Sequence, residues 1–270
     1  MTTMPVALVT GATSGIGQAA ALALAEAGFE VIGTGRNTAR IAARDAVTYV
    51  DLDVSSDESV AGTIQKVMER FGRVDVLINN AGIGSAGAAE ESSIAQARHI
   101  FDVNVFGVMR MIKAVLPHMR AQGGGRVINL SSVLGFLPAP YAAVYAASKH
   151  AIEGYSESMD HEVREHGVRV LLIEPAYTKT GFDANLVQPD APLPLYDEQR
   201  RIVGEVNTTA IESGDDPATV AKVIVAAAID AKPKLRYTAG PLARRVKTLR
   251  RIVPARAFDR QIRKMNRLPG

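Results

Sequence analysis

The sequence predicts an α/β fold, in which a parallel sheet is covered by helices on both faces of a single domain. Short runs rich in β-branched residues alternate with longer helical patterns, a glycine-rich turn joins the first strand to the first helix, and no linker, repeat or low-complexity tract interrupts the 270 residues. Alternation of this kind is typical of parallel sheets. The composition, 47% hydrophobic and 22% charged, allows one large core.

The expected elements follow in order from the N-terminus. Residues 6–9 form a short apolar strand, and an Ala- and Leu-rich helix over residues 17–27 ends at Gly28. Further strands are expected at 30–34, 47–50, 74–79, 126–131 and 168–174, and helices near 56–71, 93–121 and 143–166.

The later part of the chain is less regular. Asp216 followed by Pro217 is typical of a helix start, which predicts a helix to about residue 231 and a last strand at 235–238. Residues 176–215 lack clear periodicity and contain three prolines. We therefore expect a long irregular substrate loop there, with a disordered excursion as the alternative.

The charge of the chain is unevenly distributed. Residues 241–270 contain ten basic residues and one acid, Asp259, so this C-terminal extension carries +9 while the rest of a chain of net charge +3 carries −6. The high pI of about 9.1 belongs to the extension, so we expect no nucleic-acid partner for the domain formed by residues 1–240.

Apolar residues recur at helical spacing in the extension, with Pro254 as a break, which predicts two short amphipathic helices. Three roles remain open for them: contact with a membrane surface, a nucleic-acid patch, or packing on the substrate loop or a neighbouring subunit.

Cysteine is absent, which excludes disulfides, thiolate catalysis and cysteine-ligated metals, and we expect no metal site. The first residues lack a basic region followed by an apolar region, and the apolar stretch at 19–25 is too short to span a bilayer. The default expectation is therefore a cytoplasmic protein.

The glycine-rich turn predicts a dinucleotide site. Glycines at these spacings permit a tight turn, close approach of the backbone to a pyrophosphate, and packing of the following helix, whose N-terminal N–H groups face the phosphates. A turn with a purely structural role is the alternative. The expected cofactor contacts here are Gly11, Thr13, Ser14, Gly15, Ile16 and Gly17.

The end of the second strand indicates which dinucleotide is preferred. Gly35 stands where an acidic residue would bind the ribose 2′-hydroxyl of NAD, and Arg36 follows it. A guanidinium suits a 2′-phosphate, so NADP(H) is favoured over NAD(H), with a solvated arginine as the alternative. Asp53 and Val54 end the third strand beside the expected adenine, although Asp53 could instead cap the helix that begins near Ser56.

Tyr145 and Lys149 form the most informative pair in the sequence. Two residues four apart share one helix face, so the ammonium can lie beside the phenol and favour its ionised form. A phenol of this kind can act as an acid or base near neutral pH. Ser132 lies thirteen residues upstream.

These motifs, in this order, resemble the classical short-chain dehydrogenase/reductase family over about residues 5–240. The resemblance is carried by the glycine turn, by Asn79-Asn80-Ala81-Gly82, and by Asn104, Ser132, Tyr145, Lys149, Pro175 and Thr180. It implies a Rossmann-type doubly wound parallel sheet, a nicotinamide cofactor, and oxidation or reduction at an alcohol or carbonyl carbon. It also implies a homo-oligomer, dimer or tetramer, formed through the helices near 98–120 and 143–166.

The resemblance also implies roles for single residues. Tyr145 exchanges a proton with the substrate oxygen, Ser132 holds that oxygen, and Lys149 lowers the phenol pKa and binds the nicotinamide ribose. Asn104 connects this lysine to solvent through water. Further cofactor contacts are expected from Asn80, Ala81, Gly82, Pro175, Thr178 and Thr180. The family commonly has Pro-Gly where this chain has Pro175-Ala176, so local adjustment is expected there.

An apolar substrate pocket is expected around the reacting oxygen. Its lining comes from Ser132, Leu134, Phe136, Leu137, Tyr141, Tyr145, Phe182 and Leu186, some of which could instead belong to the core or to an oligomer surface. A hydrophobic ketone or secondary alcohol of lipid, steroid or retinoid type fits such a wall. The main hypothesis is an NADP(H)-dependent oxidoreductase, and the alternative is a non-catalytic regulator that senses the dinucleotide.

Overall fold

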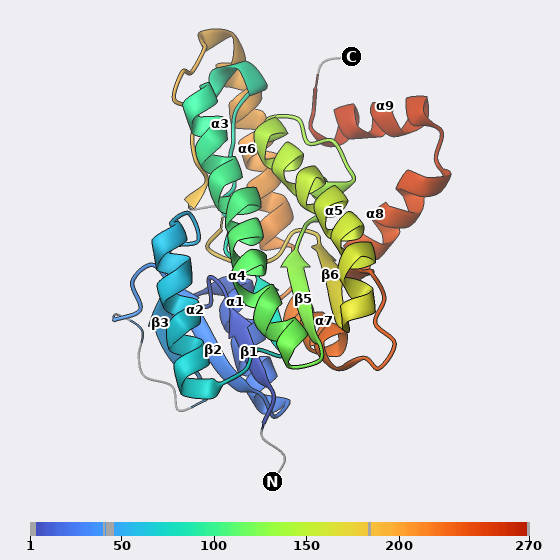
Figure 1. The fold of residues 1–270 in the computed structure, drawn as a ribbon. Helices are drawn as coiled ribbons and strands as arrows, with labels where there is room; N and C mark the ends of the chain where they lie inside the picture. The colour runs from blue at the N-terminus through green and yellow to red at the C-terminus, as the bar shows by residue number, and fades with distance from the viewer. Residues whose placement is uncertain (1–3, 40, 42–45, 183–184, 269–270) are drawn as a thin grey trace.

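The computed structural model describes residues 4–39, 41, 46–182 and 185–268, which form a parallel sheet between two layers of helices (Figure 1). The strand order is β3-β2-β1-β4-β5-β6-β7, and every pairing is parallel. The strands are β1 (Val6–Val9), β2 (Glu30–Gly35), β3 (Thr48–Asp51), β4 (Val76–Asn79), β5 (Gly125–Leu130), β6 (Val168–Pro175) and β7 (Arg236–Ala239). This is the predicted Rossmann-type doubly wound sheet in a single domain.

The main helices are α1 (Gly15–Glu26), α2 (Asp57–Phe71), α3 (Ile94–Phe101), α4 (Gly107–Ala121), α5 (Ala143–Val163), α6 (Asp197–Glu212), α7 (Pro217–Ile229), α8 (Pro241–Ile252) and α9 (Ala255–Met265). Buried residues of α2, α4 and α5 pack on one face of the sheet, and those of α1 and α7 pack on the other. The central strands β1 and β4 are buried throughout, so they lack the alternation of a half-exposed strand, whereas the edge strands β3 and β7 are mostly half-buried.

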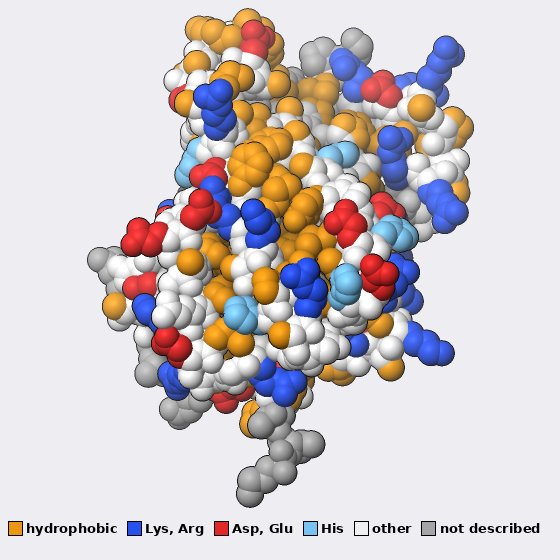
Figure 2. Space-filling model, in the orientation of Figure 1, with side chains coloured by type: hydrophobic (Ala, Val, Ile, Leu, Met, Phe, Trp, Pro, Cys, Tyr) orange, Lys and Arg blue, Asp and Glu red, His pale blue; other side chains and the backbone are white. Residues whose placement is uncertain are grey.

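Hydrophobic side chains gather on the outer surface over α4 and α5 (Figure 2). Phe106, just before α4, is 48% exposed, and Met109, Leu116 and Tyr155 of these helices are only partly buried. A surface of this kind on a folded chain is typical of a contact with another molecule.

The helix predicted over 93–121 is interrupted. The structure divides it into α3, a π-helical turn at Asp102–Phe106, and α4. Such turns lie often at functional sites because the inserted residue redirects side chains. Here the turn contains Asn104, which is buried.

The prediction of an irregular segment over 176–215 was wrong for its second half. A short 3₁₀ turn at Pro194–Tyr196 leads into α6, which is 16 residues long. Val203 is the only described residue of α6 that is buried, but Ile202, Val206 and Ala210 recur at helical spacing around it and are half-buried. This apolar spacing, together with the ion pairs from Arg201 to Glu198 and Glu205 at helical spacing, was the signal that could have revealed the helix.

The C-terminal extension forms two helices, α8 and α9, divided at Pro254 as predicted. They extend away from the sheet beside α5, and α9 lies at the edge of the molecule (Figure 1). Over the residues the structure describes, none of the helices has the length and apolar character needed to cross a membrane.

Candidate active site

The predicted site residues converge at the carboxyl ends of the central strands. β1 leads into the glycine turn, β4 into Asn80, β5 into Ser132 and β6 ends at Pro175. The strand order reverses between β1 and β4. In doubly wound sheets ligands bind in the crevice at this reversal.

The glycine turn is shaped by positions that accept no side chain. Gly11 and Gly15 have φ values of +65° and +55°, which favour glycine. Gly17 has an ordinary φ, but a methyl group on it would overlap the carbonyl oxygen of Gly11 and the side-chain amide of Asn80. The turn is therefore packed against the residues that follow β4.

Hydrogen bonds fix that packing. The hydroxyl oxygen of Thr10 accepts from the backbone N–H groups of Asn80 and Ala81, both at 3.0 Å. The amide nitrogen of Asn80 donates to the carbonyl oxygens of Thr10 and Gly11, also at 3.0 Å. Asn80 and Ala81 thus hold the turn, so the structure adds a positioning contact to the cofactor contact expected of them.

The first turn of α1 presents the features of an anion site. Ser14, the N-cap residue, has an extended backbone, and its side chain makes no capping hydrogen bond to the helix. The N-terminal N–H groups of a helix lack intrahelical partners, and the helix dipole favours negative charge there. Thr180 lies over the same turn, because a methyl group on Gly15 would lie 3.2 Å from its Cγ2 atom. A glycine cradle at a helix N-terminus fits the pyrophosphate of a dinucleotide.

The adenosine end of the predicted site contains Gly35, Arg36 and Asp53. A side chain at Gly35 would overlap the methyl group of Thr13, so Thr13 fills the space that an acidic residue would need. Arg36 is exposed. Asp53 accepts hydrogen bonds from the hydroxyl and backbone N–H of Ser55 at 2.6 and 2.9 Å, which lower its pKa. Ser56, not Asp53, caps α2.

Ser132 follows β5, and Tyr145 and Lys149 lie on the first two turns of α5. The Ser132 side chain is mostly buried and accepts from the N–H of Leu134 at 3.1 Å. The Nζ atom of Lys149 donates to the carbonyl oxygen of Leu130 at 2.7 Å and lies 5.6 Å from the centroid of the Tyr145 ring. Burial lowers the pKa of Lys149 to about 8, so this amine is still largely charged at neutral pH.

Asn104 connects the segment after β4 with α5 by hydrogen bonds. Its amide nitrogen donates to the carbonyl oxygen of Ile83 at 2.8 Å and to the Ser148 hydroxyl at 3.1 Å, and its oxygen accepts from the N–H of Ile83 at 2.8 Å. A methyl group on Gly82 would lie 3.2 Å from this oxygen. Asn104 therefore joins the chain after β4 to α5 one residue before Lys149.

The predicted apolar wall is only partly assembled around Tyr145. The ring of Phe182 lies 5.8 Å from that of Tyr145, and Phe182 and Leu186 both cover Gly84. Tyr141 instead meets Tyr196, just before α6, edge to face at 6.1 Å.

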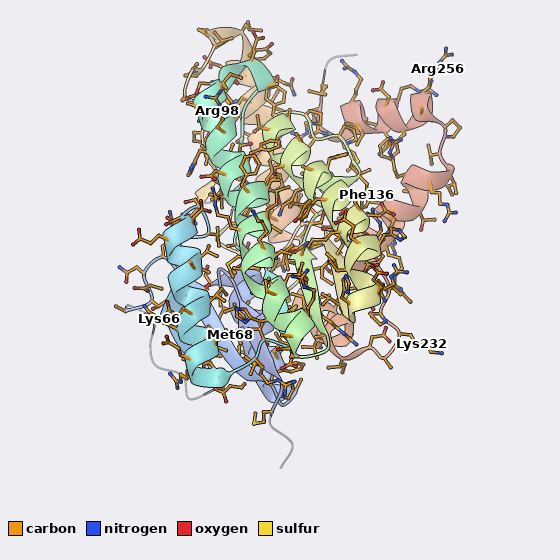
Figure 3. All side chains as sticks on the ribbon, viewed as in Figure 1. Lys66, Met68, Arg98, Phe136, Lys232 and Arg256 are labelled. Carbon is orange, nitrogen blue, oxygen red and sulfur yellow. The ribbon has the colours of Figure 1, made fainter. Side chains whose placement is uncertain are left out.

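Three other residues expected in the wall follow Ser132. Leu134 is half-buried and Leu137 is buried. Phe136 lies toward α8 (Figure 3), where the Nζ atom of Lys247 is 6.0 Å from its ring centroid.

The end of β6 departs from the family pattern without strain. Tyr141 and Arg267 are the non-glycine residues with positive φ in the described part of the chain, so Ala176 keeps an ordinary backbone. Thr178 donates its hydroxyl to the carbonyl oxygen of Ala176 at 3.1 Å and forms a β-bridge with Asp215. Pro175 and Thr178 thus lie at the end of β6, in the segment that leads to Thr180.

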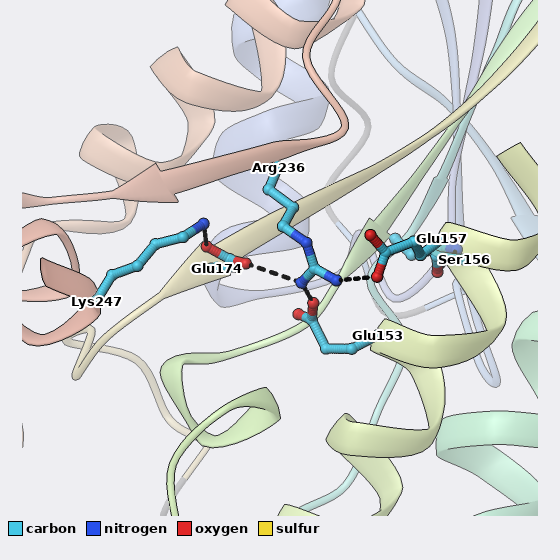
Figure 4. Close-up of polar contacts among 7 residues, drawn as sticks. Glu153, Ser156, Glu157, Glu174, Arg236 and Lys247 are labelled. Atoms are coloured by element: carbon cyan, nitrogen blue, oxygen red, sulfur yellow. Dashed lines mark hydrogen bonds and ion pairs between the residues drawn. The ribbon is translucent and has the colours of Figure 1, made fainter. Parts of the chain in front are cut away.

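Sequence reasoning missed a network of charged side chains directly behind the site (Figure 4). Arg236 of β7 pairs with Glu153 and Glu157 of α5 and with Glu174 of β6. Lys247 of α8 pairs with Glu174 at 2.6 Å. Burial raises the pKa of Glu174 and lowers that of Arg236.

The network lies within one helical turn of the catalytic candidates. Glu153 follows Lys149 by four residues on α5, and Glu174 precedes Pro175. Glu153, a charged residue on the same helix face as Lys149, was the available signal in the sequence. Its partner Arg236 lies 83 residues further along the chain, so the pair could not be recognised from the local pattern. Lys247 also contacts Phe136, so α8 is fastened to the segment after Ser132.

A second buried carboxylate fastens α6. Glu91 accepts from the N–H groups of Ala88 at 2.8 Å and Leu193 at 2.9 Å, and pairs with Arg200 of α6. Ser93 and Asp190 join the same two regions. These contacts therefore attach the segment 190–200 to the residues just before α3.

The comparisons with known proteins decide the family. The family model described as short chain dehydrogenase matches residues 5–191. The chain belongs to the short-chain dehydrogenase/reductase family. This makes it an NAD(P)-dependent oxidoreductase, and the non-catalytic alternative is not favoured.

Individual relatives cover different parts of this short-chain dehydrogenase. It is 41% identical over 178 residues to a 3-ketodihydrosphingosine reductase of Bacteroides thetaiotaomicron, a match that spans 66% of this chain and 65% of that protein. It is 36% identical to the retinol dehydrogenase 8 of Bos taurus, over 85% of this chain and 79% of that protein. A Burkholderia phymatum short-chain dehydrogenase solved in complex with NAD is 30% identical, with 97% of both chains covered and a TM-score of 0.81.

Proposed function

We propose that this enzyme interconverts a hydrophobic ketone and its secondary alcohol, with NADP(H) as the preferred cofactor and Tyr145 as the acid and base. The observation that carries the proposal is the buried ammonium of Lys149 beside the ring of Tyr145, at the strand end that also supplies Ser132. A buried cation next to a phenol favours the phenolate, which is the form that a tyrosine base needs.

The bound nicotinamide supplies or accepts the hydride. In reduction, the Tyr145 hydroxyl donates its proton to the carbonyl oxygen, and in oxidation the phenolate accepts the proton of the alcohol. Ser132 donates a hydrogen bond to the same oxygen and holds it. Lys149 stays fixed through its hydrogen bond to Leu130, and its charge favours the phenolate of Tyr145. Asn104 positions α5 by its bond to Ser148.

The preference for NADP(H) rests on Gly35, Thr13 and Arg36. Thr13 occupies the place of an acidic side chain, so the chain offers no carboxylate at position 35 to bind a ribose 2′-hydroxyl. The exposed guanidinium of Arg36 adjoins this place and supplies positive charge for a 2′-phosphate. Asp53 lies close enough to Arg36 for that charge to lower its pKa further, after the hydrogen bonds from Ser55.

The hydrophobic character of the substrate rests on the contacts of Tyr145. Phe182 lies beside its ring, and Leu186 joins Phe182 over Gly84. Two relatives are named for a ketosphingoid base and for retinol, both long apolar molecules. An apolar wall with one reacting polar group fits such substrates.

Oxidation of NADPH by a panel of ketones of increasing chain length tests the function. We expect activity that rises with apolar length, that is lost in Tyr145→Phe, and that falls by about two to three orders of magnitude in Ser132→Ala, the scale for one oxyanion donor. NADPH binding, measured by fluorescence, should survive in both variants. Activity near the parent level in Tyr145→Phe would contradict the assignment.

The cofactor preference needs its own comparison. One charge-assisted hydrogen bond contributes about 1.5–3 kcal/mol, so kcat/KM should favour NADPH over NADH by roughly ten- to a hundredfold and Arg36→Ala should remove most of this ratio. Lys66→Ala, which changes an exposed cation on α2, is the matched control. Equal kcat/KM values for the two cofactors in the parent enzyme would overturn the preference.

We also propose that two copies associate through α4 and α5, where hydrophobic side chains gather (Figure 2). Phe106, Met109 and Leu116 supply the exposed and half-buried apolar area. Light scattering should give a mass above that of one chain for the parent and a lower mass for Phe106→Asp. A monomeric parent would contradict the association.

A further inference from the structure

We infer that the described part of the C-terminal extension, residues 241–268, is a docking surface for a lipid bilayer that contains anionic headgroups. Helix α9 lies along the bilayer surface and α8 joins it to the catalytic domain. The inference rests on charge and on apolar exposure, which the proposed reaction does not use.

The two faces of α9 differ completely in chemistry. Phe258, Ile262 and Met265 recur at intervals of four and three residues and share one face, while Arg256 and Arg260, with Arg263, recur on the opposite face. No described residue of α9 is buried: Met265 is exposed, while Phe258 and Ile262 are half-buried, so the rest of the chain covers the apolar face only in part. A short helix with an apolar face and a face rich in arginine is typical of helices that lie in a membrane interface.

Helix α8 also exposes large apolar side chains. Leu242, Leu249 and Ile252 are 43%, 48% and 68% exposed, and Met265 of α9 is 51% exposed. Several large apolar side chains exposed to water on two consecutive short helices are typical of a surface that binds a protein or a membrane.

The charge of the extension selects an anionic partner. It carries +9 against −6 for the rest of the chain. Within the described residues, Lys247 supplies its ion pair to a buried carboxylate, whereas Arg244, Arg245, Arg251, Arg256 and Arg260 make no ion pair with an acidic side chain. Arg256 projects from the outer edge of α9 (Figure 3). These guanidinium groups are available to phosphate groups outside the protein.

The two helices are held in a fixed arrangement, so the surface exists before docking. The guanidinium of Arg250 lies 5.0 Å from the ring centroid of Phe258 and joins α8 to α9. Gln199 of α6 donates to the carbonyl oxygens of Asn266 and Arg267 and holds the far end of α9. Lys247 holds α8 on Glu174. A surface ordered in advance loses little conformational entropy on binding.

A bilayer can contact the apolar face and the arginine-rich face of α9 at the same time, which other anionic partners cannot do. A nucleic acid would neutralise the arginines and leave Met265 and Ile252 in water. The extension of a second copy carries the same +9 charge and would repel it. Acyl chains accept the apolar side chains while anionic headgroups accept the arginines.

Cosedimentation of the full chain with vesicles tests the inference. Vesicles of phosphatidylcholine mixed with phosphatidylglycerol are compared with vesicles of phosphatidylcholine alone, at low ionic strength and near 1 M salt, where the Debye length falls to about 3 Å. We expect binding to the anionic vesicles at low salt, and weak binding in the other three conditions.

Matched variants assign the binding to α9. Each basic residue near an anionic surface contributes about a fivefold change in partitioning, so the double variant Arg256→Gln, Arg260→Gln should bind about 25-fold more weakly. Met265→Asp should also lose binding. Lys232→Gln and Ile229→Asp change an exposed cation and an exposed apolar residue elsewhere and should leave binding unchanged.

Three outcomes overturn the inference. The first is absence of binding to anionic vesicles at low salt. The second is equal weakening by the control variants, which would show that the whole surface binds without specificity. The third is sedimentation without vesicles that the α9 variants abolish, which would assign the extension to self-association. Far-UV circular dichroism of each variant confirms that a lost signal does not come from an unfolded chain.

Discussion

The two sides of the crevice are built in different ways. The dinucleotide side, from the glycine turn to Gly82, is held by groups that lie too close together for an added side chain, as between Gly17 and the backbone of Gly11. The substrate side, after β6, is held by charged side chains that reach buried carboxylates, Glu91 and Glu174, from α6 and α8.

This difference indicates which positions tolerate substitution and which do not. Close backbone contact leaves no tolerance, because an added methyl group displaces the whole turn. Ion pairs across long distances in sequence permit different helices to be attached to one sheet, provided that the buried partner is never left without its counter-charge. The contrast predicts where single substitutions cost most free energy.

The largest loss of stability is expected for Arg236→Met. Removing this guanidinium leaves Glu153 and Glu174, which are 7% and 0% exposed, without their shared partner. Removing one member of a buried ion pair costs about 3–5 kcal/mol in the free energy of unfolding. Urea unfolding measures it.

The matched control is Arg201→Met, which removes a guanidinium that is 56% exposed and pairs with two exposed acids. It should cost no more than about 1 kcal/mol. Similar losses in the two variants would show that the network behind β6 is no stronger than surface pairs.

Sequence patterns predicted the strand, turn and helix of the dinucleotide side because their determinants are local. The strand, the glycine spacing and the following helix adjoin one another, so the fold around Gly11 and Gly17 can be read within a dozen residues. The charged network could not be read in this way. Glu153, Glu174 and Arg236 are far apart in the sequence, and only the order of β5, β6 and β7 brings them together.

Helix α6 was missed for a related reason. Its attachment to the domain includes the ion pair between Arg200 and Glu91, which lie 109 residues apart in the sequence, so the pattern around α6 does not reveal this partner. The π-helical turn at Asn104 was also not predicted, since an inserted residue leaves the apolar pattern of α3 and α4 almost unbroken.

A pH-dependent stability is expected from Lys149. The folded enzyme releases the Lys149 proton near pH 8, whereas the unfolded chain holds it up to about pH 10.5. Between these values the unfolded state binds more protons, so stability rises with pH. The shift corresponds to about 3 kcal/mol.

Urea unfolding of the parent and of Lys149→Met, from pH 7 to pH 10.5, measures this effect. The parent should gain about 3 kcal/mol relative to the variant across the window. A constant difference between the two proteins would show that Lys149 is not desolvated in the folded state.

A smaller effect on stability is expected for Gly17→Ala. The added methyl group would overlap the carbonyl oxygen of Gly11, so the turn must shift at a cost of about 1–3 kcal/mol. Because the same shift moves the N–H groups of α1, dinucleotide binding should weaken more than stability does. Fluorescence titration with NADPH, beside urea unfolding, checks both.

The smallest effect is expected for Gly62→Ala, which has the opposite sign. Gly62 lies inside α2, and nothing lies within 4 Å of the position that its Cβ would take. Alanine restricts the unfolded chain and favours the helix, so the variant should be more stable by about 0.5–1 kcal/mol with unchanged NADPH affinity. Gly17→Ala and Gly62→Ala make the same chemical change on α1 and α2. If both variants gained stability, the close packing of the glycine turn would be disproved. If both lost it, the cost at Gly17 would reflect a general intolerance of helices on this sheet and not the approach of Gly17 to Gly11.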